Sequence, residues 1–547
     1  MRDQVDRLHS MGLTLVDYIV SGQSGAHRDE VYRRMMGGKL RLVYVAPERI
    51  RDPALVEAIG HTQVTQIVVD EAHCVHMWGP SFRPDFLRIP HLFEADRPPC
   101  VALTATATAE TRRAIAETLR LCPGYDLVTK SVDRPELKFI VYGPHSSPER
   151  ITSKRDKQRV LIKILRAAQR REETAIVYTA TVREAERLVR VLDLHGFTVR
   201  HYHGRMSAQA RDEVQELFRE GIVRIIVATK AFGMGIDKAD VRYVVHYDVP
   251  GDIESYFQEA GRAGRDGQTA YCVLLYHSKD LGTQQYFIRA AFPEQSELNS
   301  LVQVLRARAA GEERILVHPE DLAAESGVDQ ERLDVALHLL EQLGFVRRSV
   351  NFTVKANLLL NRSSGWLQEH LPPDEASLLT LLERSFGVSD KRGVQLDLLR
   401  TAQILTLDPL TIDRLLTGLS SRGWAVYRPW DRGYVLEPME NLKSDAEPHL
   451  RDSDVHRLRQ SLRGNLKRMV HYAEQLGAGE CRRRFILRYF GETLETPPPI
   501  CCDLCNPDIP LPWREVPAEE LRDLSWGVDP LLHRLACRRL ERESPGR

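Results

Sequence analysis

Short apolar runs alternate with amphipathic stretches over the first half of the chain. The runs are rich in Val and Ile and end at polar residues, which is typical of strands buried in a parallel sheet. Strands are expected at residues 14–20, 40–45, 67–69, 100–103, 175–178, 198–202, 225–228 and 243–246, with helices between them, among them 1–11 and 29–36. This alternation predicts an α/β fold with two sheet domains, over residues 1–132 and 158–282, joined by a looser charged linker over 133–157.

The hydrophobic spacing becomes helical from residue 283 onward, beginning with an expected connector over 283–308. Two similar units follow, over 309–362 and 372–440. Each has a short helix, a turn, a second helix and a strand-like tail, an order typical of a winged helix. Two small helical spacers, or modules that contact proteins, would give a similar pattern.

The expected wing of the second unit is a turn at residues 431–433, between strand-like segments at 424–427 and 434–436. Trp430 and Tyr434 flank this turn. Because aromatic rings stack on bases, both are candidates for DNA contact.

Composition narrows the class of protein. The chain has 547 residues, of which 43% are hydrophobic and 28% charged, as expected for several ordinary globular domains. No apolar run reaches membrane-spanning length, and the first residues lack the apolar core of a signal peptide, so a cytoplasmic protein without a membrane contact is expected.

Charge is balanced over the whole chain, with 76 basic and 76 acidic residues. Any nucleic-acid contact must therefore use a local basic patch. Residues 451–490 offer one, with ten Lys or Arg against four acids. Phosphate contact is one interpretation of this segment, and a solvated helix face is the other.

Two neighbouring carboxylates, Asp70 and Glu71, directly follow the expected strand at 67–69. Open α/β sheets hold their ligands at the carboxyl ends of the strands. One acid there can hold Mg²⁺ while the other takes a proton from an attacking water, as nucleotide hydrolysis requires. An isolated pair of this kind is more often a charged turn, so the interpretation depends on the rest of the chain.

Two arginines in the second domain, Arg262 and Arg265, are interleaved with Gly261 and Gly264. On a helix, a spacing of three residues would put both guanidinium groups on one face. Guanidinium groups suit a γ-phosphate and its transition-state charge. A glycine-bearing loop at 228–237 follows an earlier strand.

The order of these motifs resembles that of superfamily 2 helicases. The matching segments are Asp70-Glu71-Ala72-His73, Thr104-Ala105-Thr106, the loop 232–237 and Gln258-x-x-Gly261-Arg262-x-Gly264-Arg265. Longer blocks at 70–84, 231–238 and 254–267 resemble the RecQ family of DNA helicases more specifically. The resemblance covers residues 1–282 and about 470–506, and the agreement of many ordered blocks is far more specific than one short motif.

The resemblance implies roles at a nucleotide. Asp70 would coordinate Mg²⁺, and Glu71 would activate the attacking water. Arg262 and Arg265 would be the γ-phosphate sensor and the arginine finger, in either order. Cofactor contacts are also implied for Gly235 and Asp237.

Further roles implied by the resemblance concern DNA. His73 and Gln258 would couple the nucleotide site to DNA. An aromatic-rich loop would sense single-stranded DNA by stacking, although core packing is the alternative for its two aromatic rings. The implied DNA-contacting residues are Trp78, Phe82 and Arg83 in this loop, and Thr104, Thr106 and Thr229.

Four of the nine cysteines, Cys481, Cys501, Cys502 and Cys505, lie in one short window. Members of the family carry a zinc module with one cysteine before an Arg-rich helix and three more in a later cluster. Here Pro499 occupies the place of one later cysteine, and Cys501 is the immediate neighbour of Cys502. The resemblance implies a structural zinc held by these thiolates within a module at 451–508, with the assignment of Cys501 open. A tail at 509–547 follows.

Two features depart from the family. The winged-helix candidates precede the zinc module, whereas most members have one winged helix after it. The phosphate-binding pattern GxxxxGK[ST] does not occur, and Gly37-Gly38-Lys39-Leu40 lacks its spacing and hydroxyl. The first residues resemble the segment just downstream of that loop. This indicates either an incomplete amino terminus or a chain that has lost ATP hydrolysis, and the intact Glu71 favours the first.

The sequence thus predicts a RecQ-like, ATP-dependent DNA helicase with 3′–5′ polarity that acts in recombination and repair. Single-stranded and forked DNA, ATP, Mg²⁺ and structural Zn²⁺ are the expected ligands. The carboxylate pair and the arginine pair are expected to share one phosphate pocket. One alternative is a DNA-binding protein without ATPase activity that uses the winged helices and the basic zinc module. Another is an RNA helicase, which the aromatic loop and the cysteines disfavour.

Overall fold

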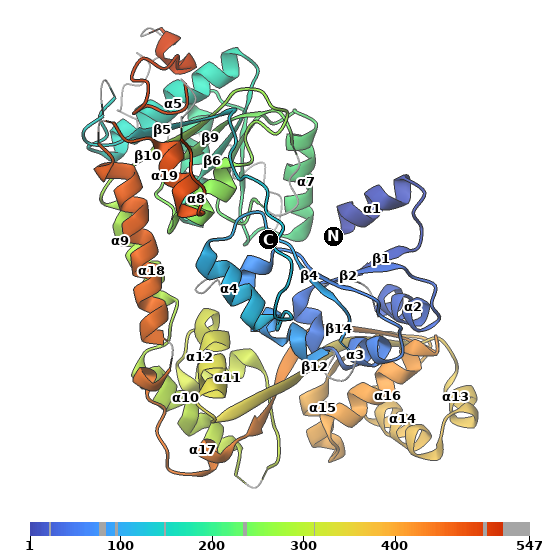
Figure 1. Cartoon of the computed structure of the whole chain (residues 1–547). Coiled ribbons are helices and arrows are strands. Elements are labelled where there is room, and N and C mark those ends of the chain that lie inside the picture. Colours follow the sequence, from blue (N-terminus) through green and yellow to red (C-terminus); the bar gives the residue numbers. More distant parts are fainter. Residues whose placement is uncertain are drawn as a thin grey trace, which may run out of the picture. The chain divides into compact units, whose positions relative to one another are not determined.

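The computed structural model describes the chain except residues 21–22, 24, 76–83, 93–96, 147–148, 234–237, 311, 454, 478, 496–499 and 518–547 (Figure 1). Contacts divide the chain into two compact units. The first unit comprises Met1–Lys130 and Tyr286–Arg463, and the second comprises Ser131–Gln285 and Gly464–Arg547. Each unit therefore combines two stretches of the chain that are far apart in sequence.

The second unit contains a six-stranded parallel sheet in the order β5-β10-β9-β6-β8-β7. Its strands are β5 (Leu137–Tyr142), β6 (Thr174–Tyr178), β7 (Val199–Tyr202), β8 (Ile225–Ala228), β9 (Val241–His246) and β10 (Ala270–Leu275). The strands are almost continuously apolar because both faces of the sheet are covered. This confirms the predicted second α/β domain.

Helices cover this sheet on both faces. Side chains of α5 (Lys154–Arg170) and α6 (Val182–Leu194) pack in one apolar cluster. Side chains of α7 (Ala208–Arg219) and α8 (Ile253–Ala260) pack in the other, together with residues from the cysteine-bearing segment. The two clusters take alternate residues of the same strands, as a sheet with two buried faces requires.

Strand β5 lies within residues 133–157, which were expected to form a loose linker. Five of its six residues are buried, and it pairs in parallel along its whole length with β10. The prediction of a linker is therefore wrong for this part. The charged residues around it concealed a short apolar strand whose pairing partner lies far along the chain.

The amino-terminal part of the first unit forms two separate parallel pairs of strands instead of one sheet. These are β1 (Val16–Ile19) with β2 (Leu42–Val45), and β3 (Ile67–Val69) with β4 (Cys100–Ala102). Val68 and Val101 are direct partners on one face, yet they are 52% and 37% exposed. A parallel pair is normally covered on both faces. The helices of this part are α1 (Arg2–Ser10), α2 (Gly25–Met36), α3 (Pro53–Gly60) and α4 (Ala109–Thr118).

The two predicted winged-helix units share a single antiparallel sheet in the order β11-β14-β12-β13. Its strands are β11 (Ile315–Val317), β12 (Val346–Leu360), β13 (Val394–Asp397) and β14 (Ala425–Pro438). The tail of the first unit, β12, pairs with the tail of the second, β14, along a ribbon from Val346–Pro438 to Leu360–Ala425. The two units are therefore joined by their tails.

The predicted helices of these units are confirmed. They are α11 (Pro319–Ser326) and α12 (Gln330–Gln342), followed by α15 (Leu398–Leu405) and α16 (Pro409–Ser421). Helices α13 (Ser364–His370) and α14 (Pro373–Phe386) join the second group, and the two groups have separate apolar cores.

The predicted second wing is wrong, because residues 431–433 lie inside β14 and form no turn. Tyr434 is also buried, at 9% exposure. Its hydroxyl donates to Asp334 Oδ1 at 3.1 Å, and the Arg348 guanidinium lies over its ring. Tyr434 therefore cannot stack on a base, while the side chain of Trp430 lies outside the described residues.

The remaining helices complete both units. The expected connector is confirmed by α9 (Asp280–Ala290) and α10 (Gln295–Arg308). Helix α17 (Glu440–Lys443), α18 (Val455–Val470), a π-helical turn (His471–Gln475) and α19 (Arg482–Tyr489) follow. Short 3₁₀ helices lie at Pro47–Arg51, Ala72–Val75, Pro84–Leu92, Leu450–Asp452 and Pro512–Glu515. No helix in the described part of the chain has both the length and the apolar character needed to cross a bilayer.

Gly433 allows the close approach of strands in the shared sheet. A Cβ atom added there would lie 2.5 Å from Phe352 Cε1 and 2.8 Å from the Val317 carbonyl oxygen. We expect Gly433→Ala to destabilise the ribbon by about 1–3 kcal/mol, because the added methyl group overpacks a buried site. Thermal unfolding of the full chain should show a lower midpoint.

Gly282→Ala is the matched control, because nothing lies within 4 Å of its added Cβ in helix α9. We expect no loss of stability from it, since Ala favours a helix over Gly. Equal unfolding midpoints for Gly433→Ala and the unchanged chain would contradict the close approach.

Candidate functional site

The carboxylate pair lies in a tight turn after β3. Glu71 has a left-handed backbone with φ 51°, which is uncommon for a residue with a side chain. Asp70 Oδ1 accepts a hydrogen bond from the Glu71 amide at 2.8 Å, and the Ala72 amide donates to the Leu103 carbonyl oxygen at 2.9 Å. Asp70 is exposed and Glu71 is half-buried. The turn thus presents two accessible carboxylates at the carboxyl end of the strand, as predicted.

His73 connects this turn to the segment after β4. Its buried ring places Nδ1 3.0 Å from Thr104 Oγ1 and 3.2 Å from Glu71 Oε2. The Thr104 hydroxyl donates to the Thr106 carbonyl oxygen at 2.9 Å, so it accepts from the imidazole. The structure therefore brings together Asp70, Glu71, His73 and Thr104, which are four of the predicted site residues. Thr106, whose carbonyl oxygen accepts from Thr104, is buried beside them.

The arginine pair lies in turns that follow α8. This helix ends at Ala260, so the prediction that both guanidinium groups share a helix face is wrong. The left-handed backbone of Gly264 contributes to the change in chain direction after α8. Its φ is +62°, and an added Cβ would lie 2.9 Å from the Gln268 carbonyl oxygen. Arg265 is exposed, and Gln258 is half-buried in α8.

Arg262 packs against the start of the glycine-bearing loop. Its Nη1 donates to the Gly233 carbonyl oxygen, and a Cβ added at Gly233 would lie 2.7 Å from Arg262 Nη2. The loop is anchored from the other side by Tyr178, whose hydroxyl donates to the Phe232 carbonyl oxygen at 2.8 Å. Burial raises the pKa of Tyr178, so this hydroxyl keeps its proton. The arginine turn and the loop are therefore in direct contact.

Other predicted site residues have different outcomes. Thr229 follows β8 and is nearly buried, with its amide 3.2 Å from the Tyr202 carbonyl oxygen. The residues that lie outside the described part of the chain are Trp78, Phe82, Arg83, Gly235 and Asp237.

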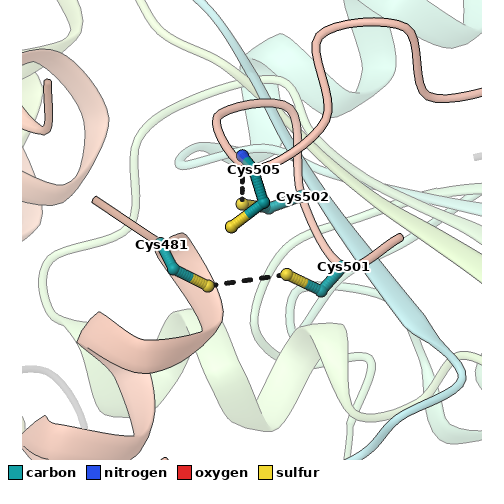
Figure 2. Close-up of side chains that lie close together, drawn as sticks. All are labelled: Cys481, Cys501, Cys502 and Cys505. Carbon is teal, nitrogen blue, oxygen red and sulfur yellow. Dashed lines mark hydrogen bonds between the residues drawn. The ribbon is translucent and has the colours of Figure 1, made fainter. Parts of the chain in front are cut away.

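The four predicted zinc-binding cysteines converge on one point (Figure 2). The sulfur atoms of Cys481, Cys501, Cys502 and Cys505 all lie within 4.8 Å of one another. Tetrahedral zinc with bonds of about 2.3 Å needs sulfur atoms about 3.8 Å apart, so the donor set fits this metal. Hydrogen bonds with Cys501 and Cys502 lower the pKa of the Cys481 thiol, which favours the thiolate that a metal needs.

A β-bridge fixes the segment that carries the two neighbouring cysteines. The Phe139 amide of β5 donates to the Cys501 carbonyl oxygen, and the Asp503 amide donates to the Phe139 carbonyl oxygen, each at 3.1 Å. The backbone of this segment is thus fixed to the edge of the sheet. Cys501 and Cys502 are fully buried there, whereas Cys505 is exposed.

Two arginines after Cys481 have roles that the sequence analysis missed. Arg482 forms a two-point ion pair with Asp503, at 2.5 and 3.0 Å. Arg483 pairs with Asp133 at 2.6 Å, and the two arginines are only 5% and 1% exposed. The prediction that the basic segment contacts phosphate is therefore wrong for these two. Their position directly after a candidate ligand was the only local signal, because the partner of Arg483 lies 350 residues away.

Comparison with known proteins agrees with this arrangement. The profile described as DEAD/DEAH box helicase matches residues 1–115, and the helicase conserved C-terminal domain matches 156–267. A RecQ zinc-binding profile matches residues 444–506, which contain the cysteine cluster.

Three curated relatives illustrate the similarity. An ATP-dependent DNA helicase RecQ of Bacillus subtilis is 37% identical over 306 residues, which cover 55% of this chain and 49% of that protein. The RecQ of Pasteurella multocida is 34% identical, covering 57% and 47%. A probable ATP-dependent DNA helicase, RecS, of Bacillus subtilis is 27% identical, covering 71% and 77%. The chain spans about half the length of the two RecQ proteins.

The parallel sheet, the carboxylate turn and the arginine turn define a protein of the two-lobed helicase class. The zinc-binding profile and the relatives narrow the resemblance to the RecQ family, to whose members the chain is similar over slightly more than half of its own length.

The cysteine cluster gives a direct test of Cys501. We expect Cys501→Ser to lose most of its zinc, because a neutral hydroxyl replaces one of four thiolates. Elemental analysis of the purified full chain measures this. Cys122→Ser is the control, because Cys122 is exposed and lies outside the cluster. Full zinc retention by Cys501→Ser would exclude Cys501 as a ligand.

Proposed function

We propose that the chain acts as a RecQ-like, ATP-dependent DNA helicase that moves 3′–5′ along one strand during recombination and repair. The observation that carries this proposal is the hydrogen bond between His73 and Thr104, which connects the carboxylate turn to the threonine segment. Similarity to RecQ helicases supports ATP as the energy source and DNA as the substrate. Single-stranded and forked DNA in the cytoplasm, at the bacterial chromosome, are the proposed targets.

The proposed chemistry is hydrolysis of the β–γ phosphate bond of ATP. Asp70 holds Mg²⁺, and Glu71 takes a proton from the attacking water. Arg262 and Arg265 stabilise the negative charge that develops on the γ-phosphate oxygens. The exposure of Asp70 and of Arg265, each in its own unit, is consistent with these roles, because an exposed side chain is accessible to a ligand.

The proposed coupling to DNA runs through His73. Its imidazole contacts both the Glu71 carboxylate and the Thr104 hydroxyl, so a shift of the threonine segment changes the surroundings of the proposed base. The proposed DNA contacts of Thr104, Thr106 and Thr229, and of the loop bearing Trp78, Phe82 and Arg83, would provide this shift. Gln258 is assigned a similar coupling role in the second unit.

Exposed basic residues on α18 support a DNA contact outside the motor. Arg457, Arg463 and Lys467 are exposed on this helix. Phosphate contacts of this kind add affinity without sequence preference, and they weaken as salt increases. The buried Arg482 and Arg483 take no part in this surface.

Residues 1–547 contain no GxxxxGK[ST] loop, whose amides and lysine would cradle phosphates. We therefore expect this chain to bind ATP very weakly. Titration with a fluorescent ATP analogue measures it, and single-stranded DNA serves as the positive control. Tight, Mg²⁺-dependent ATP binding would contradict this expectation.

Glu71→Gln tests the proposed base in a form to which a phosphate-binding loop has been restored. We expect DNA-stimulated ATP hydrolysis to fall by about 10²-fold or more, because an amide cannot accept the proton of the attacking water. DNA binding should stay unchanged. Glu57→Gln, at an exposed position of α3, is the control for loss of a carboxylate.

The second candidate function is DNA binding without catalysis, which the missing phosphate-binding loop favours. The same experiment separates the two candidates. Unchanged hydrolysis in Glu71→Gln removes Glu71 from the chemistry. A restored form that binds DNA but never hydrolyses ATP favours the binding function.

A further inference from the structure

Two arginines, the buried Arg483 and the half-buried Arg134, connect the cysteine cluster to the arginine turn within the second unit. Arg483, two residues after Cys481, contacts the segment Asp133–Leu137. Arg134, in that segment, contacts the turn that carries Arg262. Arg134 belongs to none of the motifs described above, and Arg483 lies in the arginine-rich helix of the zinc module.

Arg134 directs both of its terminal nitrogens at backbone oxygens of the turn. Nη1 donates to the Gly261 carbonyl at 3.1 Å, and Nη2 donates to the Ala263 and Gly264 carbonyls at 3.0 and 3.2 Å. Its Nε donates to Glu136 on the opposite side. One guanidinium group therefore binds three carbonyl oxygens within four residues of the turn.

The location of these carbonyls explains the need for a cation. Gly261 is the C-cap of α8, and the last carbonyls of a helix have no partner within the helix. The helix dipole also places partial negative charge at this end. A planar guanidinium group satisfies several such oxygens at once, which a lysine amine cannot do with the same geometry.

Arg483 in turn holds the segment that carries Arg134. It donates to the Asp133 carboxylate at 2.6 Å, and to the carbonyls of Arg134, Pro135 and Leu137 at 2.7, 3.2 and 2.6 Å. It is 1% exposed, so water cannot replace these bonds. Arg483 lies in the first turn of α19, two residues after Cys481, which is the N-cap of this helix.

We propose that Arg134 is a positioning residue for Arg262 and Arg265, and that Arg483 links it to the cysteine cluster. The inference rests on the proposed function for its catalytic meaning. Arg134 touches no phosphate; it fixes the backbone from which the two arginines project. The zinc module therefore supports the arginine turn through the hydrogen bonds of Arg483 and Arg134, in addition to its packing on the sheet.

Hydrogen–deuterium exchange of the full chain tests the proposal without ATP. Amides of the turn are hydrogen-bonded, including Gly264 to the Val241 carbonyl at 2.9 Å. We expect Arg134→Gln and Arg134→Lys to raise exchange over residues 261–267 by about tenfold or more. Exchange over β6 and β8 should not change. Arg134→Lys should not restore slow exchange over residues 261–267, because lysine keeps the positive charge but lacks the planar guanidinium group that binds several carbonyls at once.

Glu136→Gln is the matched control, because it removes the ion pair but leaves the three carbonyl bonds in place. Exchange over 261–267 should stay low in this variant. The proposal is overturned by unchanged exchange in Arg134→Lys, by an equal rise in Glu136→Gln, or by a rise spread over the whole sheet. The last result would make Arg134 a general stabiliser of the fold.

Arg483→Lys tests the link to the cysteine cluster. We expect faster exchange at residues 133–137 and 261–267 together, and unchanged exchange at 261–267 would overturn the link. These results stand whether or not the chain hydrolyses ATP, so they are independent of the proposed helicase activity. In a form that hydrolyses ATP, Arg134→Lys should lower kcat while the KM for ATP stays unchanged, since a misplacement of about 1 Å can cost about 10²-fold in rate.

Discussion

The second unit depends on the burial of one positive charge, that of Arg483. A guanidinium group removed from water must have its donors satisfied, and loss of one partner of such a buried pair typically costs about 3–5 kcal/mol. Here the partners are the Asp133 carboxylate and three carbonyl oxygens at the start of the sheet. The cysteine-bearing helix is thus fixed to β5 by charge as well as by apolar packing. Because β5 is an edge strand, this attachment also covers an edge that would otherwise be open.

Local patterns were sufficient for most individual elements. Helices α11 and α16 lie within the predicted units at 309–362 and 372–440; proline begins each helix, and a glycine follows the end of each within two residues. The pairing of strands could not be predicted from local sequence patterns. The ribbon of β12 and β14 joins residues far apart in the chain, and an Asp-Arg-Gly sequence that usually indicates a turn lies inside β14. Gly433 is needed there for close packing against Phe352, a reason that composition does not reveal.

In the candidate site, too, some residues could be predicted from the local sequence and others could not. Asp70, Glu71, His73 and the four cysteines were predicted because their spacing is short and their chemistry is specific. Arg483 was counted in a basic segment for which phosphate contact and a solvated helix face were both open, and its burial fits neither interpretation. Its acidic partner, 350 residues earlier, has no recognisable relation to it in the sequence. The candidate site residues were thus predictable, whereas the residues that hold them in place became visible only in three dimensions.

The ribbon also has a consequence for how this protein can vary among its relatives. Leu360 and Ala425 are paired partners at its end, so the whole second helical unit is inserted between two backbone positions that already lie side by side. Loss of that insertion requires only a short loop to close the hairpin, and the ribbon and the first helical unit keep their pairing. The tip of β12 and β14 is therefore a point at which a helical unit can be inserted without interrupting the pairing of the ribbon.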